Sequence, residues 1–252
     1  MQLPPLNAHQ AVVVYIAQSA ESSRTMPSPP SALDVIARDG CNGSLACVSL
    51  ETSKTTPFQQ VLGMDTNESP SMYVASLQSR AIPHVVLSTS TDTCAKLAHA
   101  ATMEHSSMDK LPARILQILA PGTRTIVVVH VPNVPDALDR CLASILTASP
   151  HCFVGVVQAT DQQPPPPSTV AAFPLPKQSW QKRAGVYMEE ISTTTTSWLI
   201  YAFYLRHQTR QDTVTAFDDT AILRHGGYGA MQAPVALQEV AFRLGYVPKY
   251  GA

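Results

Sequence analysis

The first position at which the sequence could carry a catalytic or metal-binding side chain is the end of its first buried strand. Residues 12–23 read VVVYIAQSAESS, a β-branched apolar run followed by small polar residues. This is the pattern of a buried strand that ends in a turn. In many α/β enzymes the end of such a strand carries an acidic metal ligand, but here the chain offers Ala17, Gln18 and Ser19. The next acid, Glu21, falls in the loop, so the strand either lost its acid or never had one.

Other reactive side chains form no known catalytic pattern. Cys47 could be imagined as a nucleophile with His84 as its base, but nothing in the spacing supports this pair. The glycine-rich stretch 224–231 fits neither the Walker A nor the dinucleotide-binding pattern, so we interpret it as a turn that needs positive φ angles. Lys177, Lys182 and Arg183 could contact a phosphate or an acidic partner, although we interpret their segment as a solvated loop.

Hydrophobic periodicity predicts alternating strands and helices that would position these residues. The expected strands cover 12–17, 43–50, 82–90, 123–131 and 152–160, and a further strand is expected around 193–204. The expected helices cover 31–40, 57 to about 63, 92–105, 111–120, 134–148 and a final segment from residue 234. Alternation of helices with continuously apolar strands predicts a mostly parallel sheet that is covered on both faces, a three-layer α/β sandwich.

Helix boundaries are also marked in the sequence. Ser31 is a plausible N-cap and Gly40 a plausible stop for the first helix. Thr91 or Asp92 should cap the helix that follows the third strand. A proline-rich stretch at 162–177 interrupts the chain, and we interpret it as a surface loop within a single domain spanning 1–252.

The order of these segments resembles the alkaline-phosphatase superfamily, and within it the cofactor-independent phosphoglycerate mutases. The stretch 29–40 is similar to a P-x-L-D-x-L-A-x-x-G pattern that follows the first strand in that family. The match is carried by Pro30, Leu33, Asp34, Ile36, Ala37 and Gly40. The resemblance covers most of residues 11–165 and implies a phosphatase-like core. The family's large cap would fall near 66–82, where only a short link is present.

The resemblance implies two divalent metal ions and a Ser or Thr nucleophile, which only a metal makes reactive near neutral pH. Thr55 or Thr56, with Ser53 nearby, would supply the nucleophile. Asp136 and Asp161 would be the remaining metal ligands. The family's Asp-His pair would fall at residues 161 and 162, and residue 162 is Gln.

Each of these residues also has a structural interpretation, which we favour. Thr55 and Thr56 would cap the helix after Pro57, and Asp136 would cap the helix that it begins. Asp161 would bound a loop. His130, in an apolar strand, is expected to be a core histidine and not a ligand. Two carboxylates do not make a two-metal site, so no cofactor is expected unless the site is rearranged.

Composition narrows the class of protein. The chain has 252 residues, of which 45% are hydrophobic and 14% charged, and its 17 basic and 18 acidic residues nearly cancel. No basic face is expected, which argues against nucleic acid as the main partner. The longest apolar stretch near the C-terminal third, 197–205, is far shorter than the roughly 20 residues of a membrane helix.

The cysteines and the N-terminal residues indicate in which cellular compartment the protein is expected. The five cysteines are an odd number without a CxxC pair, which favours a reducing compartment over a disulfide framework. No basic stretch followed by an apolar one opens the sequence, so no secretory signal is expected. We therefore expect an intracellular protein, cytoplasmic in the simplest case, with an organellar address left open.

These observations lead to three functional hypotheses. The leading one is a catalytically degenerate phosphatase-like protein that acts as a binding or scaffold component. Its candidate contact surface is Tyr246, Lys249 and Tyr250, because aromatic anchors beside a cation suit protein interfaces; packing of this tail onto its own sheet is equally compatible. The second is a metal-dependent phosphohydrolase or phosphomutase with a rearranged site. The third is a subunit of a larger assembly.

Overall fold

The structure is a computed structural model, and it describes a defined part of the chain. The described residues are 10–18, 31–49, 55–63, 83–97, 103–120, 124–133, 136–164, 182–183, 186–187, 194–207 and 212–247. Glu21, Ser53, Lys249, Tyr250, the expected cap position and most of the proline-rich loop lie outside them.

One sheet of eight strands organises the described residues, in the order β10-β2-β9-β6-β1-β5-β3-β4. Its strands are β1 (Gln10–Ile16), β2 (Cys41–Ser49), β3 (His84–Ser88), β4 (Met103–His105), β5 (Thr125–Val131), β6 (Phe153–Thr160), β9 (Thr194–Tyr204) and β10 (Ala230–Gln232). β9 runs antiparallel to both of its neighbours, and the other seven strands point the same way. β7 (Lys182–Arg183) and β8 (Val186–Tyr187) form a separate antiparallel pair.

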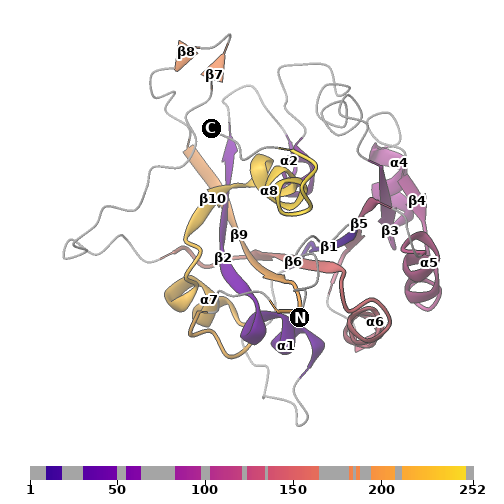
Figure 1. The fold of residues 1–252 in the computed structure, drawn as a ribbon. Coiled ribbons are helices and arrows are strands. Elements are labelled where there is room, and N and C mark those ends of the chain that lie inside the picture. The colour runs from indigo at the N-terminus through magenta and orange to yellow at the C-terminus, as the bar shows by residue number, and fades with distance from the viewer. Residues whose placement is uncertain are drawn as a thin grey trace.

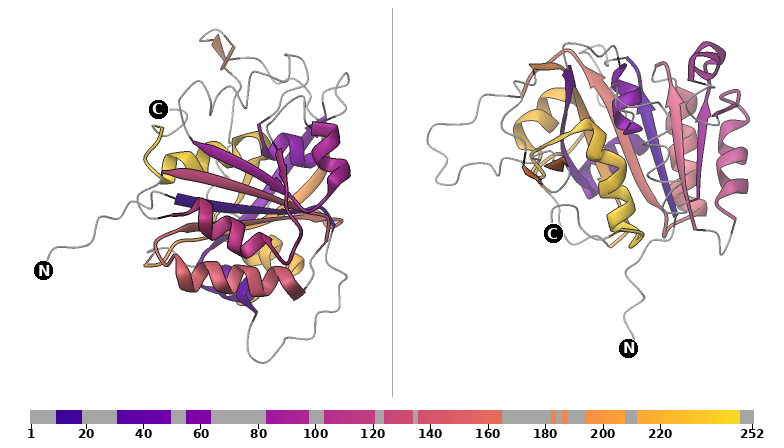
Figure 2. Two further views of the ribbon diagram at one scale, coloured as in Figure 1. Left: turned by 90° about the vertical axis from the view of Figure 1, so that its right-hand side faces the viewer. Right: turned by 90° about the horizontal axis from the view of Figure 1, so that it is seen from above.

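Helices cover both faces of this sheet (Figure 1). The helices are α1 (Ala32–Asp39), α2 (Pro57–Val61), α4 (Thr91–Leu97), α5 (Leu111–Ile118), α6 (Asp136–Ala148), α7 (Asp219–His225), the 3-10 helix η1 (Ala233–Val235) and α8 (Ala236–Arg243). α2, η1 and α8 pack on one face, which we call the α8 face, and α1, α5, α6 and α7 pack on the other, the α6 face. Figure 2 shows the twisted sheet between these layers from two further sides. The expected three-layer α/β class with a mostly parallel sheet is confirmed.

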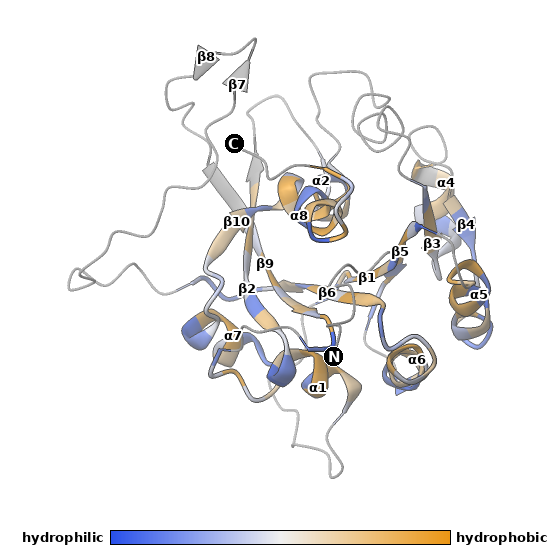
Figure 3. Ribbon diagram, viewed as in Figure 1, coloured by the Kyte–Doolittle hydropathy of each residue, from blue (hydrophilic) through white to orange (hydrophobic). Residues whose placement is uncertain are grey.

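Strand periodicity divides the core into two halves. Along β1, Val13 and Tyr15 point to the α8 face, whereas Val12 and Val14 point to the α6 face. All four side chains are at most 3% exposed, because both faces are covered. A strand buried on both sides needs apolar residues at consecutive positions. Figure 3 shows hydrophobic residues along the central strands and hydrophilic ones on the outer sides of the helices.

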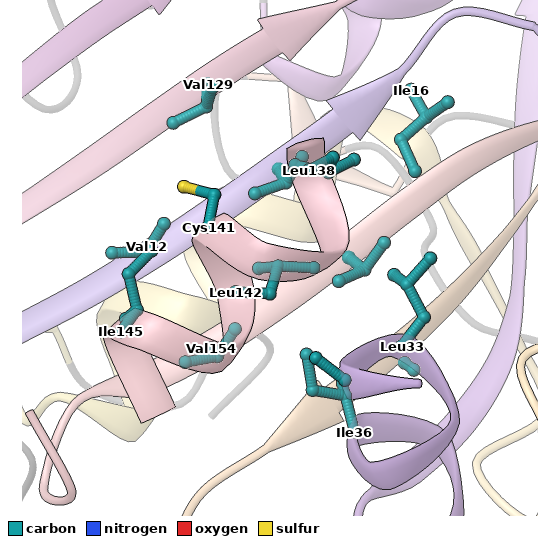
Figure 4. Packing of buried hydrophobic residues seen from close by; sticks show 14 of the residues in the cluster. Val12, Ile16, Leu33, Ile36, Val129, Leu138, Cys141, Leu142, Ile145 and Val154 are labelled. Atoms are coloured by element: carbon teal, nitrogen blue, oxygen red, sulfur yellow. The ribbon is translucent and has the colours of Figure 1, made fainter. Parts of the chain in front are cut away.

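α6 illustrates how helical periodicity supplies one half of the core. Leu138, Cys141, Leu142 and Ile145 recur at helical spacing and are buried against the sheet. Figure 4 shows these side chains over Val12, Val129 and Val154 of the three central strands, with Leu33 and Ile36 of α1 beside them. Among the described helices, none has the length and apolar content that a bilayer crossing requires.

The junction between α1 and β2 follows the expected signals. Ser31 caps α1 by accepting a hydrogen bond from the Asp34 backbone N–H, and the Asp34 carboxylate accepts one from the Ser31 backbone N–H. This is a capping box with Asp in the third position. Gly40 ends the helix, and a Cβ there would lie 2.4 Å from the Ile36 carbonyl oxygen and 2.5 Å from that of Phe203. Glycine is therefore required by close backbone approach.

One predicted helix is wrong in part. We expected a helix over residues 92–105, but α4 ends at Leu97, and Met103–His105 form strand β4 beside β3. Three residues at the edge of a sheet carry too little periodicity to be recognised in the sequence. Pairing with β3 is a non-local interaction, and it overrides the helical pattern of the preceding residues.

The half-buried carboxylate of Asp212 holds together three backbone segments at the side of the sheet that lies farthest from β4. It accepts hydrogen bonds from the backbone N–H groups of Asn42, Val214 and Gly227, each at 3.0 Å. The side-chain amide of Asn42 also donates to it at 3.0 Å. This single side chain thus joins the start of β2 to the segments before and after α7.

We predict that Asp212→Ala destabilises the protein by about 2–3 kcal/mol, because three backbone N–H groups lose a charged acceptor. Chemical denaturation monitored by circular dichroism would measure the change. Asp109→Ala, at an exposed position on another loop, should change the free energy of unfolding by less than about 0.5 kcal/mol. Equal effects of the two substitutions would contradict the role assigned to Asp212.

Candidate functional site

The parallel strands end together along one edge of the sheet, which we call the carboxyl edge. In open α/β sheets ligands bind outside this edge. The topology brings to it Ala17 after β1, Ser88 at the end of β3, the start of α6 after β5, and Asp161 after β6. α2, with Thr55 and Thr56 at its start, also lies here, because its Phe58 ring contacts residues near the ends of β1 and β5.

His130 of β5 lies inside an aromatic cluster on the α8 face of this edge. Its ring stacks on Tyr15 with a centroid distance of 5.8 Å and contacts Phe58 at 4.7 Å. Its Nδ1 atom lies 3.0 Å from the Ser88 hydroxyl. His130 is 6% exposed, and burial lowers its pKa. The expected interpretation as a core histidine agrees with these contacts.

Thr56 is the N-cap of α2. Its hydroxyl accepts a hydrogen bond from the Gln59 backbone N–H at 3.3 Å, and the Gln59 side chain accepts one from the Thr56 backbone N–H at 2.8 Å. This reciprocal pair is a capping box. The hydroxyl of Thr55 accepts a long hydrogen bond, 3.5 Å, from the Gln60 side chain. Both candidate nucleophiles therefore take part in starting α2.

The two candidate metal ligands lie on the same edge but in different settings. Asp136 is exposed at the first turn of α6, and Asp161 is exposed directly after β6. Gln162, at the position where the resemblance places a histidine, accepts a hydrogen bond from the Thr220 hydroxyl of α7 at 3.2 Å. The side chain of Gln162 thus connects the end of β6 to α7.

A buried carboxylate that the sequence reasoning missed lies beside these residues. Asp219, in the first turn of α7, is 8% exposed and accepts hydrogen bonds from the Thr160 hydroxyl and from the Gln158 amide, the latter at 3.4 Å. The pair Asp218-Asp219 signals a helix start, and Asp218 is indeed the N-cap. No local pattern, however, connects residue 219 with a partner 59 positions earlier.

Helix starts near the carboxyl edge are satisfied by the chain's own carboxylates. Asp34 accepts from the backbone N–H of Phe217 at 3.0 Å, in addition to its capping box in α1. Asp139 of α6 accepts from the backbone N–H of Leu33 at 3.3 Å. Free backbone N–H groups at helix starts are what binds phosphate groups in many proteins. Here the N–H of Leu33, in the first turn of α1, already has an anionic partner, and so does the N–H of Phe217, the residue before the N-cap of α7.

The donor set of the described residues does not fit a pair of divalent ions. No three His, Cys, Asp or Glu side chains among them gather closely enough to hold even one metal ion. Two-metal sites combine several carboxylates with imidazoles. Asp136 and Asp161 are two exposed carboxylates, and Glu21 lies outside the described residues.

A second buried charged cluster lies on the α8 face, away from this edge. Glu239 of α8 is 2% exposed and accepts hydrogen bonds from the Tyr228 hydroxyl at 2.6 Å and from Arg243 at 2.8 Å. The Arg243 guanidinium also lies over the Tyr228 ring, 4.9 Å from its centre. Burial first, and the bond to Glu239 second, raise the pKa of Tyr228 to about 12. The cluster fastens α8 to the turn before β10.

Of the candidate partner-binding residues, Tyr246 is described. It follows Gly245, which has a φ of 72° and ends α8 in a left-handed turn, with the Tyr246 N–H donating to the Ala241 carbonyl. The half-buried ring packs against the core of the α8 face and lies 5.5 Å from the Arg124 guanidinium. The aromatic ring is thus placed at the surface next to a cation, and its role in partner binding stays a prediction.

Comparisons with known proteins identify similar folds but no family and no activity. No known protein family matches the chain, and no curated protein sequence matches it. The PH0037 protein from Pyrococcus horikoshii has a similar structure, with a TM-score of 0.62 at 7% identity over 99% of this chain and 100% of that one. At this identity the likeness shows a shared fold alone.

Two further solved structures are more distant. The cofactor-independent phosphoglycerate mutase from Thermoplasma acidophilum DSM 1728 aligns with a TM-score of 0.47 at 8% identity, over 93% of this chain and 100% of that one. Ps i-CgsB in complex with k-i-k-neocarrahexaose gives 0.47 at 9% identity, over 95% and 72%. Similarity at this level carries no argument about activity.

We predict that Thr56→Ala lowers the free energy of unfolding by about 1 kcal/mol, because the N-cap hydroxyl of α2 is lost. Thr56→Ser keeps a hydroxyl and should recover most of this loss. Thermal and urea denaturation of the two variants would measure it. A Thr56→Ala variant as stable as the wild type would contradict the capping role and would leave the hydroxyl available for another one.

Cysteine alkylation tests the accessibility of the candidate Cys47 nucleophile. Burial raises the pKa of Cys47 to about 11 and those of Cys141 and Cys152 to about 12. At pH 7.5 a thiol with a pKa of 11 is ionised in about one molecule in 3,000. Iodoacetamide should therefore modify the half-exposed Cys94 and spare these three.

Mass spectrometry after brief labelling would locate the modified thiols, and labelling in urea, where all five should react, provides the control. Modification of native Cys47 at a rate near that of Cys94 would mean that the thiol is reachable and reactive.

Proposed function

We propose that this chain is a non-catalytic binding or scaffold component with a phosphatase-like α/β fold, and that its partner is another protein. The proposal depends on one observation, namely that the polar side chains at the carboxyl edge are already engaged in structural contacts. The hydroxyls and the imidazole that could react there already serve the fold: Thr56 caps α2, His130 lies between aromatic rings and Thr160 is bonded to Asp219.

Electrostatics also support a binding role over phosphate chemistry. A phosphate-transfer site needs cations, metal ions or free N–H groups to balance the charge of the transferred group. Near the described carboxyl edge the first turns of α1, α6 and α7 carry Asp34, Asp136 and Asp219 instead. Acidic residues there favour their own helix starts and repel a phosphate.

The contact surface that we propose is centred on Tyr246, with Lys249 and Tyr250 following it in the sequence. Tyr246 is half-buried, so part of its ring is available to a partner while the rest is held by the core. A rigidly held aromatic side chain loses little entropy on binding, which is why such residues dominate interface energetics. The nearly neutral net charge of the chain fits a protein partner and not a nucleic acid.

The alternative is a metal-dependent phosphohydrolase or phosphomutase with a rearranged site. It is supported by the common edge on which Asp136, Asp161 and Thr55 lie, a location at which ligands bind in open α/β sheets. Glu21 would add a third carboxylate. In this alternative two divalent ions would be required, whereas the binding role requires no cofactor.

A metal titration combined with an activity assay separates the two functions. We predict no stoichiometric binding of Mn²⁺ or Zn²⁺ by calorimetry and no turnover of a generic aryl phosphate above the rate of the buffer. In native extract the protein should elute from a size-exclusion column well above its own mass of 27.1 kDa.

Asp161→Ala and the exposed control Asp109→Ala sharpen the assay. The binding role would be overturned in favour of the enzyme if the protein binds one of these metals tightly and turns over the substrate. In that case Asp161→Ala should abolish the turnover and Asp109→Ala should preserve it. Elution as a monomer from native extract would count against a stable protein partner.

A further inference from the structure

His130 is the point at which four elements meet on the α8 face. The residue belongs to β5, its ring stacks on Tyr15 of β1, its Nδ1 atom is 3.0 Å from Ser88 of β3, and Phe58 of α2 contacts it at 4.7 Å. Among the described residues, Phe58 brings α2 into direct contact with an ionisable side chain of the sheet. One of the contacts that hold α2 on the sheet is therefore made with this imidazole.

No charged side chain of the described residues compensates a positive charge at this position. From β1 the imidazole faces Tyr15, which interacts in turn with Cys47 of β2, and both are kept neutral by burial, which raises their pKa values. β3 presents the Ser88 hydroxyl, and α2 presents the Phe58 ring. Burial lowers the pKa of His130, with no carboxylate to oppose it.

α2 itself is a weakly held element. It has five residues, so its internal hydrogen bonds cannot maintain it without packing. Its buried side chains Phe58 and Val61 join the core of the α8 face, and the helix contacts η1, which leads into α8. Release of α2 would thus uncover apolar surface and remove a contact of the C-terminal helical layer.

We propose that His130 is an acid-sensitive attachment point for α2: protonation of the imidazole below about pH 6.5 releases α2 from the sheet. The direction follows from linkage. A buried group that is harder to protonate in the folded state stabilises that state fully above its ordinary pKa. This stabilisation decreases as the pH falls through that value towards the lower folded-state pKa. The inference is independent of the proposed binding role.

A backbone hydrogen bond of His130, which raises the pKa of the imidazole, opposes this effect, and so do two kinds of side-chain contact. The faces of Tyr15 and Phe58 attract a cation, and the Ser88 oxygen can accept a hydrogen bond from a protonated ring. The Phe58 ring, however, is tilted by 50° from the imidazole, and Ser88 is a neutral partner. Loss of hydration at a position that is 6% exposed outweighs these neutral contacts, in agreement with the lowered pKa.

Amide hydrogen exchange in α2 tests the proposal. The backbone N–H groups of Gln60 and Leu62 donate to Thr56 and Phe58 within this segment and report its protection. After correction for the intrinsic pH dependence of exchange, protection should fall by up to about 30-fold between pH 7.5 and pH 5. Protection in α6, on the opposite face of the sheet, should not change.

Matched variants assign the effect to one residue. His130→Gln, which keeps a hydrogen-bonding group, should remove the pH dependence, whereas His151→Gln, at an exposed position, should retain it. If His130→Gln does not fold, Phe58→Leu serves instead: it keeps the imidazole and exposes it more, so the loss of protection should become smaller and its midpoint should move to higher pH.

Unchanged protection of α2 at pH 5 in the wild type would refute the proposal. So would pH dependence that survives in folded His130→Gln or disappears in His151→Gln. Simultaneous loss of protection in α6 would mean global unfolding and not release of α2, which also contradicts it. Where Phe58→Leu replaces His130→Gln, the proposal is also refuted if the pH midpoint of the loss of protection in α2 stays where it is in the wild type.

Discussion

Burial of the central sheet on both faces is the constraint on which the rest of the structure depends. β1, β5 and β6 carry aliphatic residues at consecutive positions, because nearly every position along them is buried. A polar side chain that enters these strands must find its partner inside the protein, since an unpaired buried polar group is costly. His130 and Thr160 are such residues, and each is paired with a side chain from another element. Gln158 is paired through its amide nitrogen only, because its buried Oε1 atom accepts no hydrogen bond among the described residues.

The same constraint explains where the carboxylates are placed. A chain with only 14% charged residues has few acids, and several of them satisfy backbone N–H groups or buried side chains. Asp34 and Asp139 serve helix starts, Asp212 joins three backbone segments, and Glu239 neutralises Arg243. Charge-assisted hydrogen bonds of this kind are among the stronger polar contacts in proteins. Acids placed in this way hold the layers together.

Much of this fold could be predicted from the sequence, because its signals are local. β1, β5 and β6 match the expected apolar runs, and Ser31 and Gly40 bound α1 as expected. The partners of Asp212 and Asp219 could not be predicted, since Asn42 lies 170 positions away and Thr160 lies 59 positions away. The role of the Asp219 carboxylate and the strand pairing of β4 depend on the assembled sheet, which no sequence window contains.

The stability of this fold and its chemistry therefore lie in different places. Aliphatic layers such as Val12, Leu142 and Val154 occupy the middle of the strands and the inner faces of the helices. Residues such as Thr56 and Asp161 occupy the carboxyl edge, where side chains can change without disturbing those layers. The PH0037 protein can share this fold at 7% identity because the packed aliphatic layers tolerate many combinations of apolar residues. The function of the chain must consequently be decided at the edge and at the surface, residue by residue, and not from the sheet.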